Sequence, residues 1–245
     1  MSGVQLIGLE GIPEVQPGDD LAELIRAALA AADIGLEDDD VLVVTQKIVS
    51  KAEGRVVELS SVEPSALARD WASRWGKDAR QVELVLRESA SIVRMADGGL
   101  IISRTRHGLV CANAGVDLSN VGAGDVATLL PEDPDGSARA LCQALGVPVI
   151  ISDSFGRPWR NGIVNVAIGV AGLQGLIDLR GQPDASGRVM HSTIIAVADE
   201  LASAADLAGG KVTQRPVVLV RGFDWQGGGD GARSLVMDRG HDLFP

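Results

Sequence analysis

Besides Ser152, five polar side chains follow a short apolar segment within ISDSFGRPWRNG, residues 151–162. They are Asp153, Ser154, Arg157, Arg160 and Asn161. Residues 147–151 have the β-branched, apolar character of a fully buried strand, and the glycines and proline that follow predict a loop. Charged groups at the end of a core strand are costly unless they are paired, bound to a metal or covered by a ligand. The segment therefore predicts a metal or ligand site.

Oxygen ligands for a hard cation are the chemistry that these residue types suggest. Asp153 and Ser154 lie in apolar, glycine-containing surroundings, and so does Asp117 in AGVDLSN. Carboxylates and hydroxyls suit Mg²⁺ or Mn²⁺, which usually share their octahedral shell with substrate phosphates. Each aspartate taken alone is explained more simply by a turn or a helix cap. The coincidence of an acid, a hydroxyl and two arginines within residues 153–160 favours a functional site.

The two arginines in this segment add a second kind of recognition. The forked donors of Arg157 and Arg160 suit phosphate or carboxylate groups, although surface ion pairs explain them as well. Trp159, between them, is interpreted as a packing residue. A site with both a cation and arginines would accept an anionic small molecule.

Other familiar sites are missing from the sequence. GGKVT, residues 209–213, resembles part of a P-loop, but Ala205 stands where the first glycine is required. No two histidines have metal-ligand spacing, and no GxSxG motif marks a serine nucleophile. We therefore expect neither a P-loop, nor a histidine-based zinc site, nor a serine hydrolase.

The composition indicates a globular protein that acts on small molecules. The 245 residues are 46% hydrophobic, with a formal net charge of −11. This charge argues against general affinity for nucleic acid or an anionic membrane. Cys111 and Cys142 form no CxxC pair, which predicts reduced thiols. With no secretory signal at the start and no apolar run that spans a bilayer, the expected location is the cytoplasm.

Helices and apolar strands alternate along the chain, which predicts a mixed α/β fold. The strands are expected at residues 4–9, 41–45, 92–95, 99–103, 147–151 and 215–223. The helices are expected at residues 19–32, 64–76, 78–89, 135–146 and 192–208. Polar residues gather just past several strands, where α/β proteins bind ligands, so one composite cleft is expected. The acids of residues 38–40 and 131–136 are interpreted as solvated turn residues, and Trp71 and Trp75 as core residues.

Five longer segments make the sequence similar to a known family. They are GIPEVQPGDDL, VLVVTQKIVSKAEGR, NAGVDLSNV, ISDSFGRPWRNG and AADLAGGKVTQRPVVLVRGF. They occur in the same order as in the coenzyme F420-0:L-glutamate ligase (F420 γ-glutamyl ligase) family, and the resemblance covers essentially the whole chain. It implies a distinctive mixed α+β fold, with mixed sheets flanked by helices and without a P-loop. Residues 1–245 would form the ligase domain, as one body or two intertwined lobes, with no separate nitroreductase-like domain after it.

The resemblance also implies an activity. Members of the family join L-glutamate to the lactyl carboxylate of F420-0 with GTP and Mg²⁺ or Mn²⁺, giving γ-linked glutamyl tails, and they form homodimers. K⁺ is a further candidate cation. An acyl phosphate is the expected intermediate, because a free carboxylate is a poor electrophile. The alternatives are a metal- and nucleotide-dependent ligase or phosphotransferase acting on another anionic acceptor, or a module that binds nucleotide without catalysis.

Site residues follow from the resemblance position by position. The residues implied to contact GTP are Ile12, Pro13, Glu14, Val15, Gln46, Lys51, Asn120, Gly209, Gly210, Lys211, Val212, Thr213 and Gln214. Asp117 and Asp153 match ligands of one metal, and Ser154 matches a ligand of a second. Asp153, Arg157 and Arg160 are the expected catalytic residues. Which anionic group each arginine holds is left open.

One position departs from the pattern of the family. Many relatives have Glu or Gln where this chain has Lys211. An ammonium group has no lone pair with which to ligate a cation. The second metal would therefore lose a protein ligand, or Lys211 would supply positive charge in its place.

Overall fold

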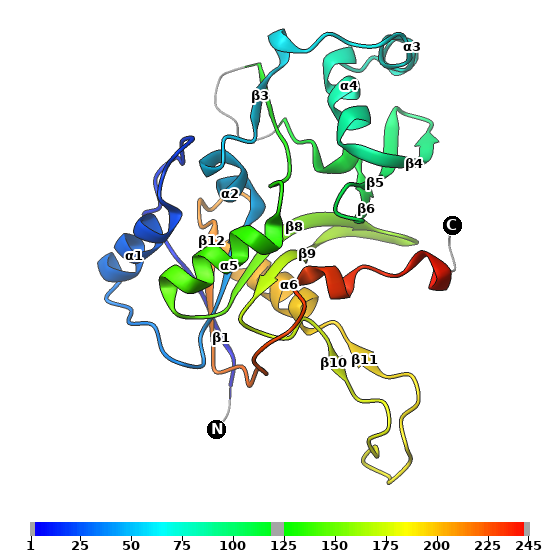
Figure 1. The fold of residues 1–245 in the computed structure, drawn as a ribbon. Coiled ribbons are helices and arrows are strands. Elements are labelled where there is room, and N and C mark those ends of the chain that lie inside the picture. The colour runs from blue at the N-terminus through cyan, green and yellow to red at the C-terminus, as the bar shows by residue number, and fades with distance from the viewer. Residues whose placement is uncertain (1–2, 119–124, 243–245) are drawn as a thin grey trace.

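A five-stranded sheet forms the centre of the protein in the computed structural model, which describes residues 3–118 and 125–242 (Figure 1). Its strand order is β1-β12-β2-β8-β9. The strands are β1 (Gln5–Gly8), β2 (Val41–Thr45), β8 (Val149–Arg157), β9 (Arg160–Ala171) and β12 (Val217–Arg221). β2 and β8 run parallel, whereas the other neighbours pair antiparallel. The predicted mixed α/β class is confirmed.

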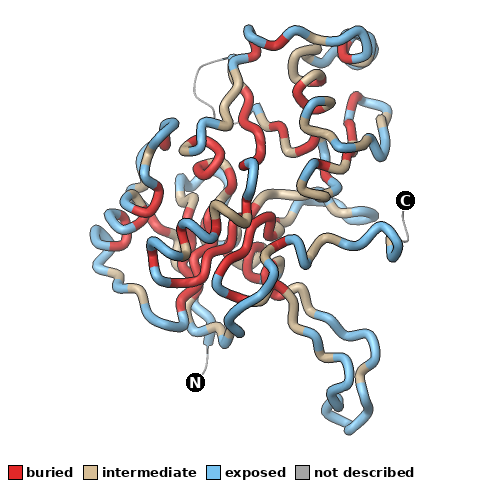
Figure 2. Tube along the Cα trace, viewed as in Figure 1, coloured by how far each residue is buried: buried red, intermediate tan, exposed pale blue. Residues whose placement is uncertain are grey.

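Helices cover both faces of this sheet. α1 (Leu21–Ala31), α2 (Gln46–Ala52) and α5 (Pro134–Leu145) pack on one face, and α6 (Val197–Gly209) packs on the other. In β2, Leu42 and Val44 belong to the first hydrophobic cluster, and Val41 and Val43 belong to the second. A strand covered on both faces reads as a continuous apolar run, which explains VLVVT. Figure 2 shows the buried residues concentrated in these central strands.

A second region has its own hydrophobic cluster and lies at the top of Figure 1. Its elements are β3 (Val56–Glu58), η1 (Leu59–Ser61), α3 (Ala66–Trp75), α4 (Ala79–Glu88), β4 (Ser89–Ala96), β5 (Leu100–Thr105), β6 (Val110–Ala112), η2 (Asn113–Gly115) and β7 (Val126–Thr128). β4, β5 and β6 form an antiparallel sheet, while β3 pairs with β7. The ring of Trp71 lies 6.0 Å from that of Trp75. Trp75 is 36% exposed, so the prediction that it is a core residue was wrong.

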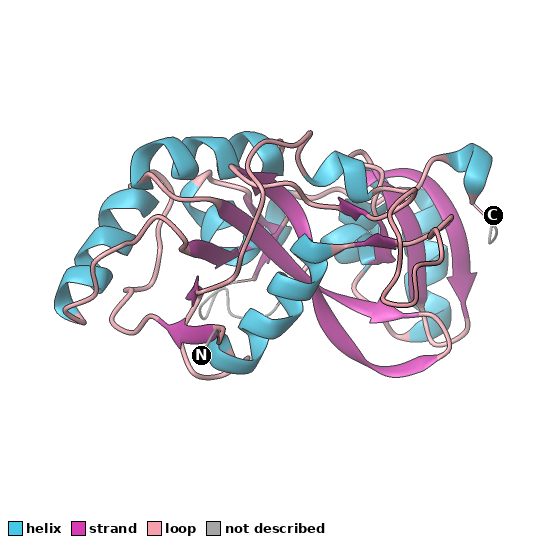
Figure 3. Cartoon of the chain, turned by 90° about the horizontal axis from the view of Figure 1, so that it is seen from below, coloured by secondary structure: helices cyan, strands magenta, loops and turns pink. Residues whose placement is uncertain are grey.

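An exposed arm projects from the central sheet. β10 (Ile177–Asp178) and β11 (Ile194–Ile195) pair at its base, and most residues between them are exposed (Figure 2). Because Ile194 and Ile195 pair with β10, α6 begins at Val197 and not near residue 192 as predicted. Two 3-10 helices follow β12 along the chain, η3 (Ala232–Leu235) and η4 (Arg239–His241). Figure 3 shows the strands and helices from below.

The polar segment after residue 151 is a strand, which corrects the predicted loop. β8 continues to Arg157, and its partner β9 pairs with it from Arg160 to Ala171. The apolar run in β9 supplies a long hydrogen-bonding partner, so the backbone groups of the polar residues are satisfied in a ladder. Pro158 and Trp159 form the turn of this hairpin. Trp159 has a φ of 58° and is 81% exposed, so the interpretation as a packing residue was also wrong.

Two acids expected in solvated turns are structural. Asp40 is 0% exposed, and its two carboxylate oxygens accept hydrogen bonds from Arg221 Nε at 2.8 Å and Nη2 at 2.7 Å. Asp135 accepts from the backbone amides of Val170, at 2.9 Å, and Ala232, at 2.8 Å. Their partners lie far along the chain, where the local sequence gives no sign of them.

Candidate functional site

A cavity of about 760 Å³ lies at the carboxyl ends of β2 and β8. These strands are parallel neighbours, and Thr45 pairs with Ser152. The residues that follow in each strand therefore reach the same edge of the sheet, which is where α/β proteins bind ligands. The cavity is lined from segments 12–15, 45–51, 111–117, 152–165 and 206–216. The cleft predicted from the sequence is therefore present in part. Polar residues after β2 and in β8 line the cavity, whereas residues 157–161 and 221–224, expected in the same cleft, do not.

Asp117 and Asp153 line this cavity together, although they come from different regions of the fold. The backbone of Asp117 is fixed by hydrogen bonds in both directions with Thr128, at 3.0 and 2.8 Å. Asp153 lies on β8 opposite Val166. Burial raises the pKa of Asp153 to about 6, the amide of Ser154 lowers it, and the charge of Asp117 raises it. The two carboxylates are thus close enough to repel, which a bound cation would relieve.

Two ammonium groups face this acidic pair. Lys47 Nζ lies 2.7 Å from Asp117 Oδ2. Lys211 Nζ donates a hydrogen bond to Ser154 Oγ. The positive charges of both lysines lower the pKa of Asp153. In the sequence, Lys47 belongs to the polar group after residues 41–45 that predicts the composite cleft, although no individual role is assigned to it there.

A polar chain continues from Ser154 into the sheet and α6. Ser154 Oγ donates to Asn165 Oδ1 at 2.7 Å, across the β8–β9 pair. Asn165 Nδ2 donates to Asp206 Oδ1 at 3.2 Å, and Ser203 Oγ donates to the Asn165 carbonyl at 2.7 Å. Asn165 and Asp206 both line the cavity, and sequence reasoning missed both. For Asn165, an amide interrupting an apolar run was the available signal.

The residues predicted to contact GTP lie mostly around the same cavity. Those that line it are Ile12, Pro13, Glu14, Val15, Gln46, Lys51, Gly210, Lys211, Val212 and Gln214. Gly209 and Thr213 belong to the adjoining segment but are not among the lining residues. Asn120 lies outside the described residues.

Lys51 and Gln46 are held in place by buried contacts of α2. Lys51 is 8% exposed, and its Nζ lies 2.5 Å from Glu14 Oε1. Gln46 is 2% exposed and accepts a hydrogen bond at 2.8 Å from Ser50 Oγ. A largely buried ammonium beside a cavity is a strong counter-charge, because little water screens it.

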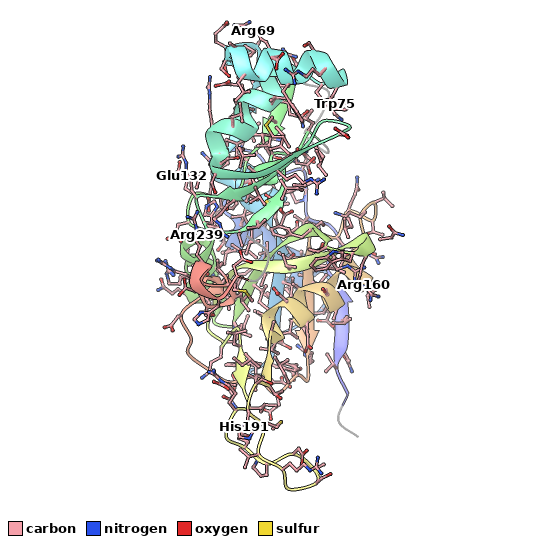
Figure 4. The ribbon with its side chains drawn as sticks, turned by 90° about the vertical axis from the view of Figure 1, so that its right-hand side faces the viewer. Arg69, Trp75, Glu132, Arg160, His191 and Arg239 are labelled. Atoms are coloured by element: carbon pink, nitrogen blue, oxygen red, sulfur yellow. The ribbon has the colours of Figure 1, made fainter. Side chains whose placement is uncertain are left out.

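Arg157 and Arg160 lie at the end of the β8–β9 hairpin, outside the cavity lining. Arg157 Nη2 donates to the Asn161 carbonyl at 3.0 Å, while its buried Nε has no hydrogen-bond partner among residues 3–118 and 125–242. Arg160 is exposed at the end of the hairpin (Figure 4). Gly156 and Ile163, from the same hairpin, do line the cavity. The hairpin thus connects the cavity to an arginine-bearing surface.

The donor set fits a hard divalent cation with an incomplete protein shell. Asp117, Asp153 and Ser154 offer two carboxylates and a hydroxyl, and Mg²⁺ commonly takes one or two carboxylates and completes its shell with water and phosphate. Across residues 3–118 and 125–242, no group of three or more His, Cys, Asp or Glu side chains forms a metal site. Burial raises the pKa of Cys111 to about 12, so this cavity-lining thiol stays protonated.

The fold and the site together define an α/β protein whose acidic and basic side chains meet at the edge of a mixed sheet, without a P-loop. Residues 11–222 match the family described as F420-0:Gamma-glutamyl ligase. The chain belongs to this family, as the sequence motifs indicated.

Several relatives are similar over nearly their whole length. The protein named coenzyme F420:L-glutamate ligase from Methanothermobacter thermautotrophicus is 48% identical over 251 residues, covering 99% of each chain. The protein of the same name from Methanopyrus kandleri is 45% identical and covers 100% of each chain. The one from Methanocaldococcus jannaschii is 39% identical over 98% of this chain and 96% of its own length.

Membrane insertion through a helix finds no support in the described part of the chain, where no helix has both the length and the apolar character to cross a bilayer.

Proposed function

We propose that this chain is a GTP-dependent ligase that adds L-glutamate to the lactyl carboxylate of coenzyme F420-0 and so forms γ-linked glutamyl F420. Family membership and the shared name of the full-length relatives support the glutamate and F420-0 parts of this proposal. The proposed use of GTP and a divalent cation is supported by one observation: Asp117, Asp153 and lysine side chains converge around one cavity.

The charges in the cavity suit a reaction between two anions. The γ-phosphoryl group of GTP must approach a carboxylate that is itself negative. Lys47, Lys51 and Lys211 all line the cavity and supply positive charge there. Asp117 and Asp153 would hold Mg²⁺ or Mn²⁺, with the Ser154 hydroxyl beside them, and such an ion neutralises phosphate charge and orients the phosphates for transfer. K⁺ is a further cation that the site would admit beside GTP.

The reaction proceeds in two balanced steps. An oxygen of the lactyl carboxylate attacks the γ-phosphorus, the bond to the β–γ bridging oxygen breaks, and GDP leaves. The amine of glutamate then attacks the carbonyl carbon of the acyl phosphate, the C–O bond to phosphate breaks, and inorganic phosphate and a proton are released. The lysines hold the phosphates through both steps, and the surrounding side chains exclude water from the acyl phosphate.

The hairpin arginines are candidates for holding the organic anions. Arg157 and Arg160 lie beyond the cavity lining on the strands that carry Asp153 and Asn165. Their planar donors bind carboxylate or phosphodiester groups in a bidentate way. We propose that these arginines bind the carboxylate of the acceptor or of the incoming glutamate.

We further propose that the protein acts as a cytoplasmic homodimer.

Mass spectrometry of a reconstituted reaction tests the function. The purified chain is incubated with F420-0, L-glutamate and Mg²⁺, with and without GTP. We expect a gain of one or more glutamyl units in the product only when GTP is present, together with release of GDP and phosphate. GTP binding without phosphate release would indicate a binding module instead. Phosphate release without glutamylation of F420-0 would favour the alternative of another anionic acceptor, which assays with other carboxylates would then identify.

A further inference from the structure

The side chain of Ser154 is engaged on two sides. Its hydroxyl donates to Asn165 Oδ1 at 2.7 Å and accepts a hydrogen bond from Lys211 Nζ. A hydroxyl has one donor hydrogen and two acceptor lone pairs, so one lone pair is already directed at a positive charge. A divalent cation bound to the same oxygen would lie next to this ammonium and be repelled by it. Lys211 therefore disfavours a metal ion at Ser154.

The acidic groups of the cavity are also too few for two divalent ions. Asp117 and Asp153 are close enough for their charges to interact. Among the described residues, the other two acids that line the cavity are engaged elsewhere, Glu14 by Lys51 and Asp206 by Asn165. The described residues contain no group of three acidic, histidine or cysteine side chains that would hold a metal. Residues 119–124, SNVGAG, contribute no carboxylate by their sequence. Paired ions about 3.5–4 Å apart need more anionic ligands than two carboxylates supply.

We infer that this site takes a single divalent cation, between Asp117 and Asp153, and that the ammonium of Lys211 takes the place of a second cation beside Ser154. Lys211 then serves as a phosphate-binding residue that contacts substrate oxygens directly. Its partner Ser154, held by Asn165, fixes the position of the ammonium. This inference rests on the metal- and nucleotide-dependent function proposed above.

The number of Mn²⁺ ions per chain tests the inference without any turnover. The protein is equilibrated by dialysis with Mn²⁺ and a saturating non-hydrolysable GTP analogue, and the retained metal is measured. Electron paramagnetic resonance of the same sample distinguishes an isolated Mn²⁺ from a coupled pair, because ions about 3.5–4 Å apart are spin-coupled. We expect one Mn²⁺ per chain with the spectrum of an isolated ion. Two ions per chain, or a coupled spectrum, overturn the inference.

Two substitutions at Lys211 sharpen the test. Lys211→Glu exchanges the ammonium for a ligand, and we expect it to bind a second Mn²⁺ and to give a coupled spectrum. Lys211→Met removes the charge without adding a ligand, and we expect it to keep one Mn²⁺ and to bind the GTP analogue about tenfold more weakly. Unchanged nucleotide affinity in Lys211→Met would contradict the phosphate-binding role.

The experiments distinguish a failure of this inference from a failure of the proposed function. One Mn²⁺ per chain, with the expected behaviour of both variants, supports the inference even if F420-0 is not glutamylated, in which case only the acceptor is wrong. A wild-type protein that retains no Mn²⁺ with the nucleotide overturns both the inference and the metal site. Circular dichroism spectra matching wild type show that the variants are folded.

Discussion

The Asp153 carboxyl is partly desolvated, and burial raises its pKa from 3.8 to about 6. The folded chain therefore binds this proton more tightly than the unfolded chain, and stability falls as the pH rises from about 4 to 6. Above pH 6 the ionised Asp153 carboxylate destabilises the folded state by its full amount, which is about 2 kcal/mol after allowance for the partial exposure of the side chain. In metal-free protein, we expect Asp153→Asn to raise the melting temperature at pH 8, with the gain lost below about pH 4.

The same substitution should remove most GTP-dependent ligation, because the amide lacks the charge that offsets a cation. Higher stability with lost activity separates a site residue from a structural one. Thermal melts in a chelator and the glutamylation assay at saturating Mg²⁺ measure the two effects. Unchanged turnover, or a lower melting temperature at pH 8, would refute the assignment.

Asp40 is a buried acid whose removal should destabilise the protein, in contrast to Asp153. Its carboxylate is 0% exposed and binds Arg221 through two hydrogen bonds. Removing one partner of a buried pair leaves the other charge uncompensated, so Asp40→Ala should lower the free energy of unfolding by about 3 kcal/mol. The neighbouring Asp39→Ala is the matched control, because Asp39 is exposed and should change stability by less than about 0.5 kcal/mol. Equal effects in urea denaturation would contradict the role of this pair.

The residue scale also explains what sequence reasoning identified. Asp117 and Asp153 stand out in the sequence as acids in apolar, glycine-containing segments, but neither segment alone decides between a turn and a site. The family resemblance predicted that they act together, and the structure brings both to one cavity. Asn165 and Asp206 were missed, because their functional context is a contact between β9 and α6. Asp40 was misinterpreted for the same reason: its partner Arg221 lies 181 residues away.

At the scale of elements, β9 depends on a glycine where it crosses α5. A Cβ on Gly169 would lie 2.3 Å from the backbone oxygen of Pro134, and backbone cannot move aside as a flexible side chain can. We expect Gly169→Ala to cost about 1–3 kcal/mol. Gly35→Ala is the control in the same denaturation experiment, because a Cβ at Gly35 would have no atom of the described residues within 4 Å. A neutral Gly169→Ala would show that β9 and α5 are less closely packed than the structure indicates.

The β8–β9 hairpin carries a prediction about substrate binding. Arg160 is exposed at its end, so Arg160→Ala should change stability by less than about 0.5 kcal/mol. If it holds the acceptor or glutamate, the KM of that one substrate should rise about tenfold while the KM of GTP is unchanged. Steady-state kinetics with each substrate varied in turn measures this. If the KM of each of the three substrates is the same in the variant as in the wild type, Arg160 does not bind a substrate.

The lengths of these two strands could not have been predicted from the sequence. Asp153 to Arg157 have a polar, loop-like composition, and only the long antiparallel pairing with β9 makes them a strand. By contrast, β2 was predicted with its observed bounds, because a strand buried on both faces is a continuous apolar run. Its alignment with β8 follows from parallel pairing, and this is why the predicted cleft lies where the structure has it.

At the scale of the whole molecule, the cavity lies where separate hydrophobic clusters meet. Asp153, Lys47 and Lys211 come from the central sheet and its connections, whereas Asp117 follows η2 in the second region. The formal net charge of −11 alone suggests a protein that would not bind anionic ligands. Three lysines nevertheless line the cavity at one edge of the sheet. Local charge therefore decides which ligand binds. The sequence predicted this edge, whereas the exposed arm between β10 and β11 has no periodic pattern that would have revealed it.

Because the cavity is lined by residues of two regions, nucleotide with Mg²⁺ should stabilise those regions together. At a concentration about 100 times its Kd, a ligand that binds only the folded state stabilises it by about 2.7 kcal/mol. For a chain of this length that corresponds to a rise in melting temperature of about 5–10 °C. We expect this rise with a GTP analogue and Mg²⁺, and a much smaller one in Asp117→Asn.

Hydrogen exchange locates the effect. A cation shared by Asp117 and Asp153 should slow exchange both in residues 110–117 of the second region and in residues 41–47 of the central sheet, because opening either region would break a ligand contact. In Asp117→Asn the protection of residues 110–117 should disappear, while residues 41–47 keep the part that nucleotide contacts alone provide. Protection confined to the central sheet in the wild-type protein would mean that Asp117 does not take part in binding, and the site would then have to be rebuilt around Asp153 and the lysines.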